Sequence, residues 1–203
     1  NYDRHVKKRR KPRILYAGSG AHFDVDNKTG MQDDFTHVRD IIRKTTNKYQ
    51  WVFVGGYPPP LHDLVRSGKI EFIPWCPLYD LPRLLFKLNI NCMVAPLMDN
   101  TFNRCKSDIK YVEACAYGIP IVCQDMVTYK SAPFKFNTGS EMIDNITDIL
   151  KDKTSYMKIC RKARLEAELR WLENDNNLGK YVELYTLPYG DPKRKLLNSF
   201  NNI

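Results

Sequence analysis

The side chains best suited to bind a charged ligand are concentrated in the segment NRCKSDIKYVEACAYGIPIV, at positions 103–122. Arg104 and Lys106 lie just before Ser107, and serine is a residue type that favours the N-cap position of a helix. A helix is therefore predicted from Ser107 onward. Its first turn presents free N–H groups and the positive end of the helix dipole, which attract a phosphate. This part of the segment predicts an anion site.

Two further polar residues lie on neighbouring faces of the same predicted helix, which Gly118 is expected to end. Lys110 adds a third cation, and Glu113 can accept two hydrogen bonds from a ribose diol, as acidic residues do in other nucleotide sites. Taken singly, Ser107 is most often a cap, Lys110 a solvated lysine and Glu113 an exposed acid. Together, between a buried strand and an apolar stretch, they favour a nucleotide site.

A second candidate is the glycine turn in YAGSGAH, at positions 16–22. A turn made of Gly18, Ser19 and Gly20 lets the backbone approach a phosphate, although it lacks the full GxGxxG spacing and such turns occur in many α/β proteins. His22 follows the turn. Two interpretations stay open for it: contact with a phosphate or a sugar, and a histidine in a surface loop.

Trp75 and an acidic pair are weaker candidates. Trp75 can stack on a base, but a core or rim aromatic is favoured, because it ends the apolar run IEFIPW at 70–75, which is typical of a buried strand. Asp24 and Asp26 have the spacing of a metal-binding pair, but acidic loop residues are common turn formers. No cysteine or histidine cluster has the spacing of zinc ligands, so no metal site is predicted.

These candidates are positioned by alternating strands and helices. Parallel strands need helical crossovers, so the alternation predicts a Rossmann-like, doubly wound parallel sheet with helices on both faces. Ligands bind such sheets outside the carboxyl ends of the strands. After Gly139 only helices are predicted. The predicted strands cover 13–20, 51–56, 70–75, 90–97 and 119–125, and the predicted helices between them cover 33–49, 61–68, 80–89 and 107–118.

Length and charge divide the chain into one domain and two ends. A length of 203 residues with 43% hydrophobic content suits a single core. The net charge of +9 comes in large part from basic runs at 5–13 and 193–195. We therefore predict a basic linker at 1–12, a domain at 13–188 and a basic tail at 189–203. Solvated ends are preferred to a polyanion-binding arm.

Cysteine placement and hydropathy indicate the compartment. Cys92 and Cys123 lie in apolar runs, where a free thiol behaves as a small hydrophobe. No stretch approaches the roughly 20 apolar residues of a membrane span, and the basic N-terminal residues precede no apolar signal region. A soluble protein of the cytoplasm is expected.

The run KSDIKYVEACAYGIPIV, at 106–122, resembles the donor-binding signature of GT-B glycosyltransferases, especially retaining family four enzymes of bacterial or phage type. In that signature an acidic helix residue precedes a small-residue stretch and GxPVV. The segments YAGSGAH, WVFVGG and IEFIPWCPLYDLPRLL are similar to the first three strands of the family's C-terminal domain, and RWLENDN to its terminal helical segment. The resemblance therefore covers nearly the whole chain.

The resemblance implies a role for each candidate. It implies that Glu113 binds the ribose hydroxyls, that the turn at 18–20 approaches the phosphates and that the loop at 74–76 borders the base. Cations aimed at a leaving diphosphate stabilise the transition state. Many family members carry a second glutamate where this chain has Cys105, so that acid's role is not carried over. The resemblance implies that the diphosphate is surrounded by Arg104, Lys106, Ser107 and Lys110. The three cationic residues of this set, Arg104, Lys106 and Lys110, are the predicted catalytic residues.

The predicted function is transfer of a sugar from a UDP or GDP sugar to a hydroxyl acceptor, without a cofactor. The acceptor is a glycan or another hydroxyl compound, modified nucleic acid included. In the family a separate N-terminal domain holds the acceptor, so the chain is predicted to be the donor-binding half of a longer protein. A non-catalytic nucleotide- or nucleic-acid-binding module is the alternative, and a nucleotide-sugar epimerase of the same fold ranks lower.

Overall fold

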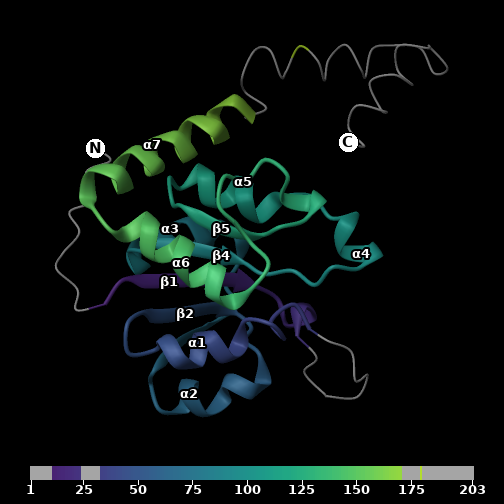
Figure 1. Ribbon diagram of the computed structural model, residues 1–203, viewed down its shortest axis with the longest axis vertical. Helices are drawn as coiled ribbons and strands as arrows, with labels where there is room; N and C mark the ends of the chain where they lie inside the picture. Colours follow the sequence, from purple (N-terminus) through teal and green to yellow (C-terminus); the bar gives the residue numbers. More distant parts are fainter. Residues whose placement is uncertain (1–10, 24–32, 171–178, 180–203) are drawn as a thin grey trace.

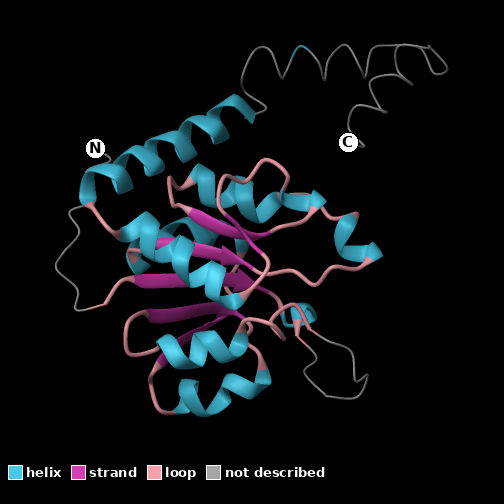
Figure 2. Cartoon of the chain, viewed as in Figure 1, coloured by secondary structure: helices cyan, strands magenta, loops and turns pink. Residues whose placement is uncertain are grey.

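The computed structural model describes residues 11–23, 33–170 and 179. Its centre is a six-stranded sheet in the order β3-β2-β1-β4-β5-β6, in which every neighbouring pair of strands is parallel (Figures 1 and 2). The strands are β1 (Arg13–Gly18), β2 (Gln50–Gly55), β3 (Ile70–Pro74), β4 (Cys92–Ala95), β5 (Ile121–Gln124) and β6 (Lys135–Phe136). The Rossmann-like α/β prediction is confirmed.

Helices cover both faces of this sheet, because successive residues of a strand point to opposite sides. Within β1, Ile14 and Tyr16 pack in one buried cluster and Leu15 in the other. The first cluster contains side chains of α1 (Arg39–Thr45), α2 (His62–Arg66) and α6 (Gly139–Leu150), and the second those of α3 (Leu81–Leu88) and α5 (Ile109–Ala116). Helix α7 (Lys153–Arg170) packs on α5, and the short α4 (Thr101–Arg104) precedes α5.

Aromatic packing anchors the turn that follows β1. The ring of Tyr16 meets Phe35 edge-on at 4.7 Å between centroids and Phe23 at 5.7 Å. Phe23 follows the short 3-10 turn Gly20–His22 directly, and both phenylalanines are buried. The hydrophobic contacts therefore hold this turn against the carboxyl end of β1.

Several expected boundaries were wrong. Within the predicted helix 33–49, only α1 is helical. The residues before α1 form a turn, in which the Asp33 carboxylate accepts a hydrogen bond from the N–H of Phe35. The strand β6 was missed, since two residues that pair with β5 leave no apolar run to detect. Residue 108, not Ser107, is the N-cap of α5, and its side chain makes no capping hydrogen bond.

The basic lead is also only partly a solvated linker. Arg13 is buried within β1, and its guanidinium contacts both carboxylate oxygens of Glu71 at 2.8 Å. Lys11 donates to the backbone oxygen of Thr46. Residues 1–10, the tail at 189–203, the pair Asp24 and Asp26, and RWLENDN beyond Arg170 lie outside the described residues.

Cysteine burial agrees with the prediction. Cys92 and Cys123 are fully buried, and all six cysteines carry free thiols. Among the described residues, no helix is both long and apolar enough to cross a bilayer.

We expect Glu71→Ala to lower the free energy of unfolding by about 2 kcal/mol. Removing one partner of a buried ion pair leaves an uncompensated charge, at a cost of about 3–5 kcal/mol when both are buried. The loss is smaller here because the side chain of Glu71 is 37% exposed, against 8% for Arg13. Urea unfolding measures the change.

A matched control is the pair of Arg43 and Asp63, which has similar contacts on the surface. Because water and salt screen an exposed pair, Asp63→Ala should cost much less than Glu71→Ala. Equal losses for the two variants would contradict a special role for the buried pair.

Candidate functional site

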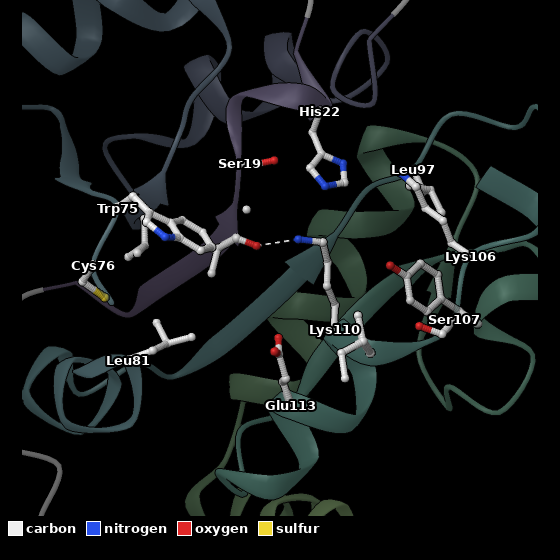
Figure 3. A pocket seen from close by; sticks show the side chains of 15 residues that line it. Ser19, His22, Trp75, Cys76, Leu81, Leu97, Lys106, Ser107, Lys110 and Glu113 are labelled. Atoms are coloured by element: carbon white, nitrogen blue, oxygen red, sulfur yellow. Dashed lines mark hydrogen bonds between the residues drawn. The ribbon is translucent and has the colours of Figure 1, made fainter. Parts of the chain in front are cut away.

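A cavity of about 380 Å³ lies at the carboxyl edge of the sheet (Figure 3). Its walls come from the ends of β1 and β2, the segments after β3 and β4, and the beginning of α5. In the sheet, β1 lies between β2 and β4, so the strand order changes direction at β1. Open α/β sheets bind ligands beside such a point, at the carboxyl ends of the strands. The cavity is lined by Ala17, Gly18, Ser19, His22, Val54, Trp75, Cys76, Leu81, Leu97, Lys106, Ser107, Ile109, Lys110, Glu113 and Tyr129.

The structure thus brings together most of the residues singled out in the sequence. Two predicted residues are not in the lining. Gly20 begins the 3-10 turn after β1 without reaching the cavity. The residues that do line it are Gly18, Ser19, His22, Trp75, Lys106, Ser107, Lys110 and Glu113.

Arg104 is the second predicted residue outside the cavity. It ends α4, and its guanidinium makes two hydrogen bonds to the Asp99 carboxylate, at 2.6 and 2.8 Å. Both side chains are more than half exposed. Because this geometry directs the charge to Asp99 and solvent, Arg104 is not part of the site that the structure forms.

The N-terminal end of α5 is available to a ligand. Asp108 occupies the N-cap, but its carboxylate accepts a hydrogen bond from Arg170 of α7 at 2.6 Å instead of capping the helix. The first N–H groups of a helix have no acceptor within the helix. Since Ser107 lies beside them in the cavity wall, an anion there would meet backbone donors, a hydroxyl and the positive end of the dipole.

Lys110 carries a charge that is almost removed from water. Its Nζ donates to the backbone oxygen of Ala17 at the end of β1 (Figure 3). It also lies 4.5 Å from the ring centroid of Tyr16. Burial, together with the positive charge on Lys106, lowers the pKa of Lys110 from its usual range to about 8, while Glu113 opposes this shift. Desolvation disfavours the ammonium form, so an anion in the cavity would stabilise it.

Gly18 makes this position of Lys110 possible. A Cβ atom at residue 18 would lie 2.5 Å from the Tyr16 hydroxyl oxygen and 2.9 Å from Lys110 Nζ. Any other residue would therefore require the Tyr16 ring or the ammonium group to shift. The glycine allows a close approach of two side chains, whereas the expected approach of this turn to a phosphate stays a prediction.

Glu113 lies one turn further along α5 on the cavity wall, below Lys110 in Figure 3. The carboxylate is half-buried, and burial raises its pKa although the charge of Lys110 lowers it. A partly desolvated carboxylate accepts strong hydrogen bonds from hydroxyl groups. Its position fits the predicted contact with a diol.

Trp75 is a rim residue and not part of the core, since it is 63% exposed. The edge strand β3 has only Ile70 fully buried, so the expectation of a buried strand was wrong. Gly55, with φ of 94°, lets the end of β2 approach this ring: a Cβ there would lie 2.6 Å from Trp75 Cε3. The indole can therefore offer a face to a planar group at the cavity mouth.

Sequence reasoning missed Asp34. Its Oδ2 lies 2.6 Å from His22 Nδ1, and its Oδ1 accepts from the backbone N–H of Met98 and from Asn103. Burial raises the pKa of Asp34, but the hydrogen bonds from His22 and Met98 and the charge of Lys106 outweigh it and hold the pKa below its usual range. No local signal identified Asp34, because it was assigned to a helix.

Within the described residues, no group of three histidine, cysteine, aspartate or glutamate side chains could hold a metal ion. The expectation of a site without metal or cofactor stays a prediction.

No protein-family model matches the sequence, and no curated protein matches it. The fold is similar to that in the crystal structure of Anabaena Alr3699/HepE in complex with UDP and glucose, with a TM-score of 0.61 and 14% sequence identity. The match covers 87% of this chain and 49% of that one. The chain thus spans about half the length of that protein, with which it shares a fold.

The cavity charges should control the titration of Lys110. In the free protein we expect its ammonium to titrate near pH 8. Glu113→Gln should lower this pKa further, because a negative charge that favours the ammonium is lost, and Lys106→Met should raise it by removing a like charge. Side-chain NMR of labelled lysines over a pH series measures all three values. Identical pKa values in the three proteins would contradict the arrangement of charges.

Proposed function

We propose that the chain is the donor-binding domain of a glycosyltransferase and that its cavity holds a nucleoside diphosphate sugar. The observation that carries this proposal is the convergence of Lys106, Lys110 and the open N-terminal end of α5 on one side of a single cavity, with Glu113 beside them. This set offers cations and N–H donors for a diphosphate and a carboxylate for a diol. The shared fold with a protein crystallised with UDP and glucose supports it.

Each part of the ligand has a chemical counterpart in the cavity wall. The diphosphate would lie against Lys110, Lys106 and Ser107, the ribose against Glu113, and the base near Trp75. The cavity volume of about 380 Å³ is at the lower end of the usual range for ligand sites. Because it is open to solvent beside the exposed Trp75, part of the ligand can extend beyond it.

The chemistry depends on where charge develops. As the bond between the sugar and the diphosphate lengthens, negative charge grows on the leaving oxygen. Lys110, held by Ala17, and the helix N–H groups are in place before this happens. With Lys106 beside them, they would stabilise the transition state more than the bound substrate. The Lys110 ammonium also gains from the added negative charge, because its burial is otherwise unfavourable.

The acceptor would be bound elsewhere. We propose that a further domain of a longer protein supplies the acceptor site and the other wall of the reaction cleft, in line with a chain that spans about half of its structural neighbour. The acceptor would be a hydroxyl compound, such as a glycan. The retaining family four type, the choice between UDP and GDP sugars, the domain limits 13–188 and the location in the cytoplasm stay predictions.

Isothermal titration calorimetry with UDP, GDP and their sugars tests the proposal. We expect one nucleoside diphosphate to bind, and Glu113→Ala to weaken it by about 1.5–3 kcal/mol, the usual value of hydrogen bonds to a charged group. Asp148→Ala serves as a control, since Asp148 is an exposed carboxylate on α6 that pairs with Lys151 and is not part of the cavity lining. Absence of binding by the native chain, or unchanged affinity in Glu113→Ala, would contradict the proposal.

The pH dependence of UDP affinity tests the role of Lys110. The protonated side chain binds the anion, so affinity should be full well below its pKa of about 8 and fall above it. Between about pH 7 and pH 9.5 the expected loss is roughly tenfold, since deprotonation removes the cation. Lys110→Met should bind UDP weakly and with much less pH dependence.

Uridine is the matched ligand for this experiment because it lacks the diphosphate. Uridine and UDP share the uracil N3–H, which ionises at alkaline pH, so the ratio of UDP affinity to uridine affinity isolates the effect of the diphosphate. This ratio should fall as the pH rises in the native protein and change little with pH in Lys110→Met, and the variant should bind uridine as the native protein does. If Lys110→Met lowers the affinities for uridine and for UDP by the same factor, Lys110 shapes the cavity and does not contact the phosphates.

A further inference from the structure

His22 is oriented by a buried network that the diphosphate site does not require. Asp34, 6% exposed, receives three hydrogen bonds: from His22 Nδ1 at 2.6 Å, from the Met98 N–H at 2.7 Å and from Asn103 Nδ2 at 3.0 Å. Asn103 also donates to the backbone oxygen of Met98. The network therefore joins the turn after β1, the segment after β4 and helix α4 around one carboxylate.

This network fixes how the imidazole can act. Asp34 is held as a carboxylate by its donors, so it has no proton to give and the short contact requires the proton to lie on His22 Nδ1. In the neutral ring the other nitrogen, Nε2, then carries a lone pair and accepts hydrogen bonds. Within the described part of the chain Nε2 has no hydrogen-bond partner, while the ring lines the cavity.

The position of His22 separates it from the groups that face the nucleotide. In Figure 3 Trp75 lies to one side of Lys110 and Glu113 lies below it, whereas His22 lies above it, across the cavity from Glu113. A ligand that runs from base to ribose to diphosphate along Trp75, Glu113 and Lys110 would reach His22 last. In such a ligand the sugar is attached beyond the diphosphate, and its hydroxyl groups are hydrogen-bond donors.

We propose that His22 and Asp34 form a sugar-recognition pair, in which Asp34 orients His22 and Nε2 accepts a hydrogen bond from a sugar hydroxyl of the donor. This inference rests on the proposed function, because it requires a nucleotide sugar in the cavity. It assigns His22 to specificity and Asp34 to positioning. The pair distinguishes a nucleotide sugar from the free diphosphate, which the lysines alone do not.

The test compares the affinities of a nucleoside diphosphate and of its sugar by calorimetry, for UDP with UDP-glucose, UDP-galactose and UDP-N-acetylglucosamine and for GDP with GDP-mannose. The ratio of the two affinities is the sugar increment. In His22→Ala and Asp34→Asn the increment should fall by roughly threefold to tenfold, the range of one neutral hydrogen bond. In His22→Ala the affinity for the diphosphate itself should change by less than about twofold. In Asp34→Asn the affinity for the diphosphate changes as well, because the Asp34 charge acts on Lys110, and the ratio removes that change.

Asp33→Asn is the matched control. It makes the same charge change one residue earlier. Within residues 11–23 and 33–170, the carboxylate there bonds the N–H of Phe35 and the hydroxyl of Thr36. Its sugar increment should equal that of the native protein. If Asp34→Asn does not fold, His22→Ala carries the test, since His22 is a half-buried turn residue outside the hydrophobic clusters.

Imidazole ¹⁵N NMR gives a readout that a purely structural role of Asp34 would not change. The native protein should show the proton on Nδ1. In Asp34→Asn the carboxamide can donate to Nδ1 and shift the proton to Nε2, which then no longer accepts. A native Nε2–H tautomer, no sugar increment in the native protein, or an unchanged increment in His22→Ala would overturn the proposal.

The two proposals fail differently. If the native protein binds no nucleoside diphosphate, the proposed function is wrong. If it binds one and His22→Ala weakens the diphosphate and its sugar equally, the function stands, but His22 contacts the phosphates and the sugar-recognition pair is refuted.

Discussion

The hydrogen bond from Lys110 to the carbonyl of Ala17 joins the first turn of α5 to the carboxyl end of β1. It places an ammonium group under the cavity, over the ring of Tyr16, where water reaches it poorly. A side chain at residue 18 would crowd this contact, since its Cβ would lie 2.9 Å from Lys110 Nζ. A cation that is costly to bury is most stable when an anion shares the site, so the free protein already has the electrostatic asymmetry that a diphosphate would neutralise.

The rest of the site depends on contacts that keep competing charges away from this one. Arg170 of α7 draws the Asp108 carboxylate off the N-terminal end of α5, so a helix far along the chain leaves that end open. The Asp34 carboxylate accepts hydrogen bonds from three donors, His22, the Met98 N–H and Asn103. Asp99 accepts hydrogen bonds from Arg104 outside the cavity. Among the described residues, the charges that face the cavity are therefore those of Lys106, Lys110 and Glu113.

Sequence reasoning found the features that are encoded locally. The strands β1 to β5 are apolar runs between helices. The cavity residues on α5 and in the turn after β1 are close in sequence, so residue types and spacing, together with the family resemblance, identified them. Sequence reasoning missed Asp34 because tertiary contacts decide its role: its partners Met98 and Asn103 lie more than sixty residues away. Two further errors are local. Asp108 instead of Ser107 is the N-cap of α5, and Arg104 bonds Asp99, five residues before it. Trp75 became a rim residue because β3 lies at the edge of the sheet.

The most direct test of the central claim is to map where a nucleoside diphosphate binds, by titrating UDP and GDP separately into ¹⁵N-labelled protein and monitoring the amide signals. A donor site predicts saturable shifts with one of the two, concentrated in Gly18–His22 and in Lys106–Glu113, where backbone N–H groups meet the phosphates. The structure has a second cavity, of about 270 Å³, beside Phe134 and Ile159. Shifts confined to that cavity, or no saturable shifts with either nucleotide, would contradict a donor site at the end of β1.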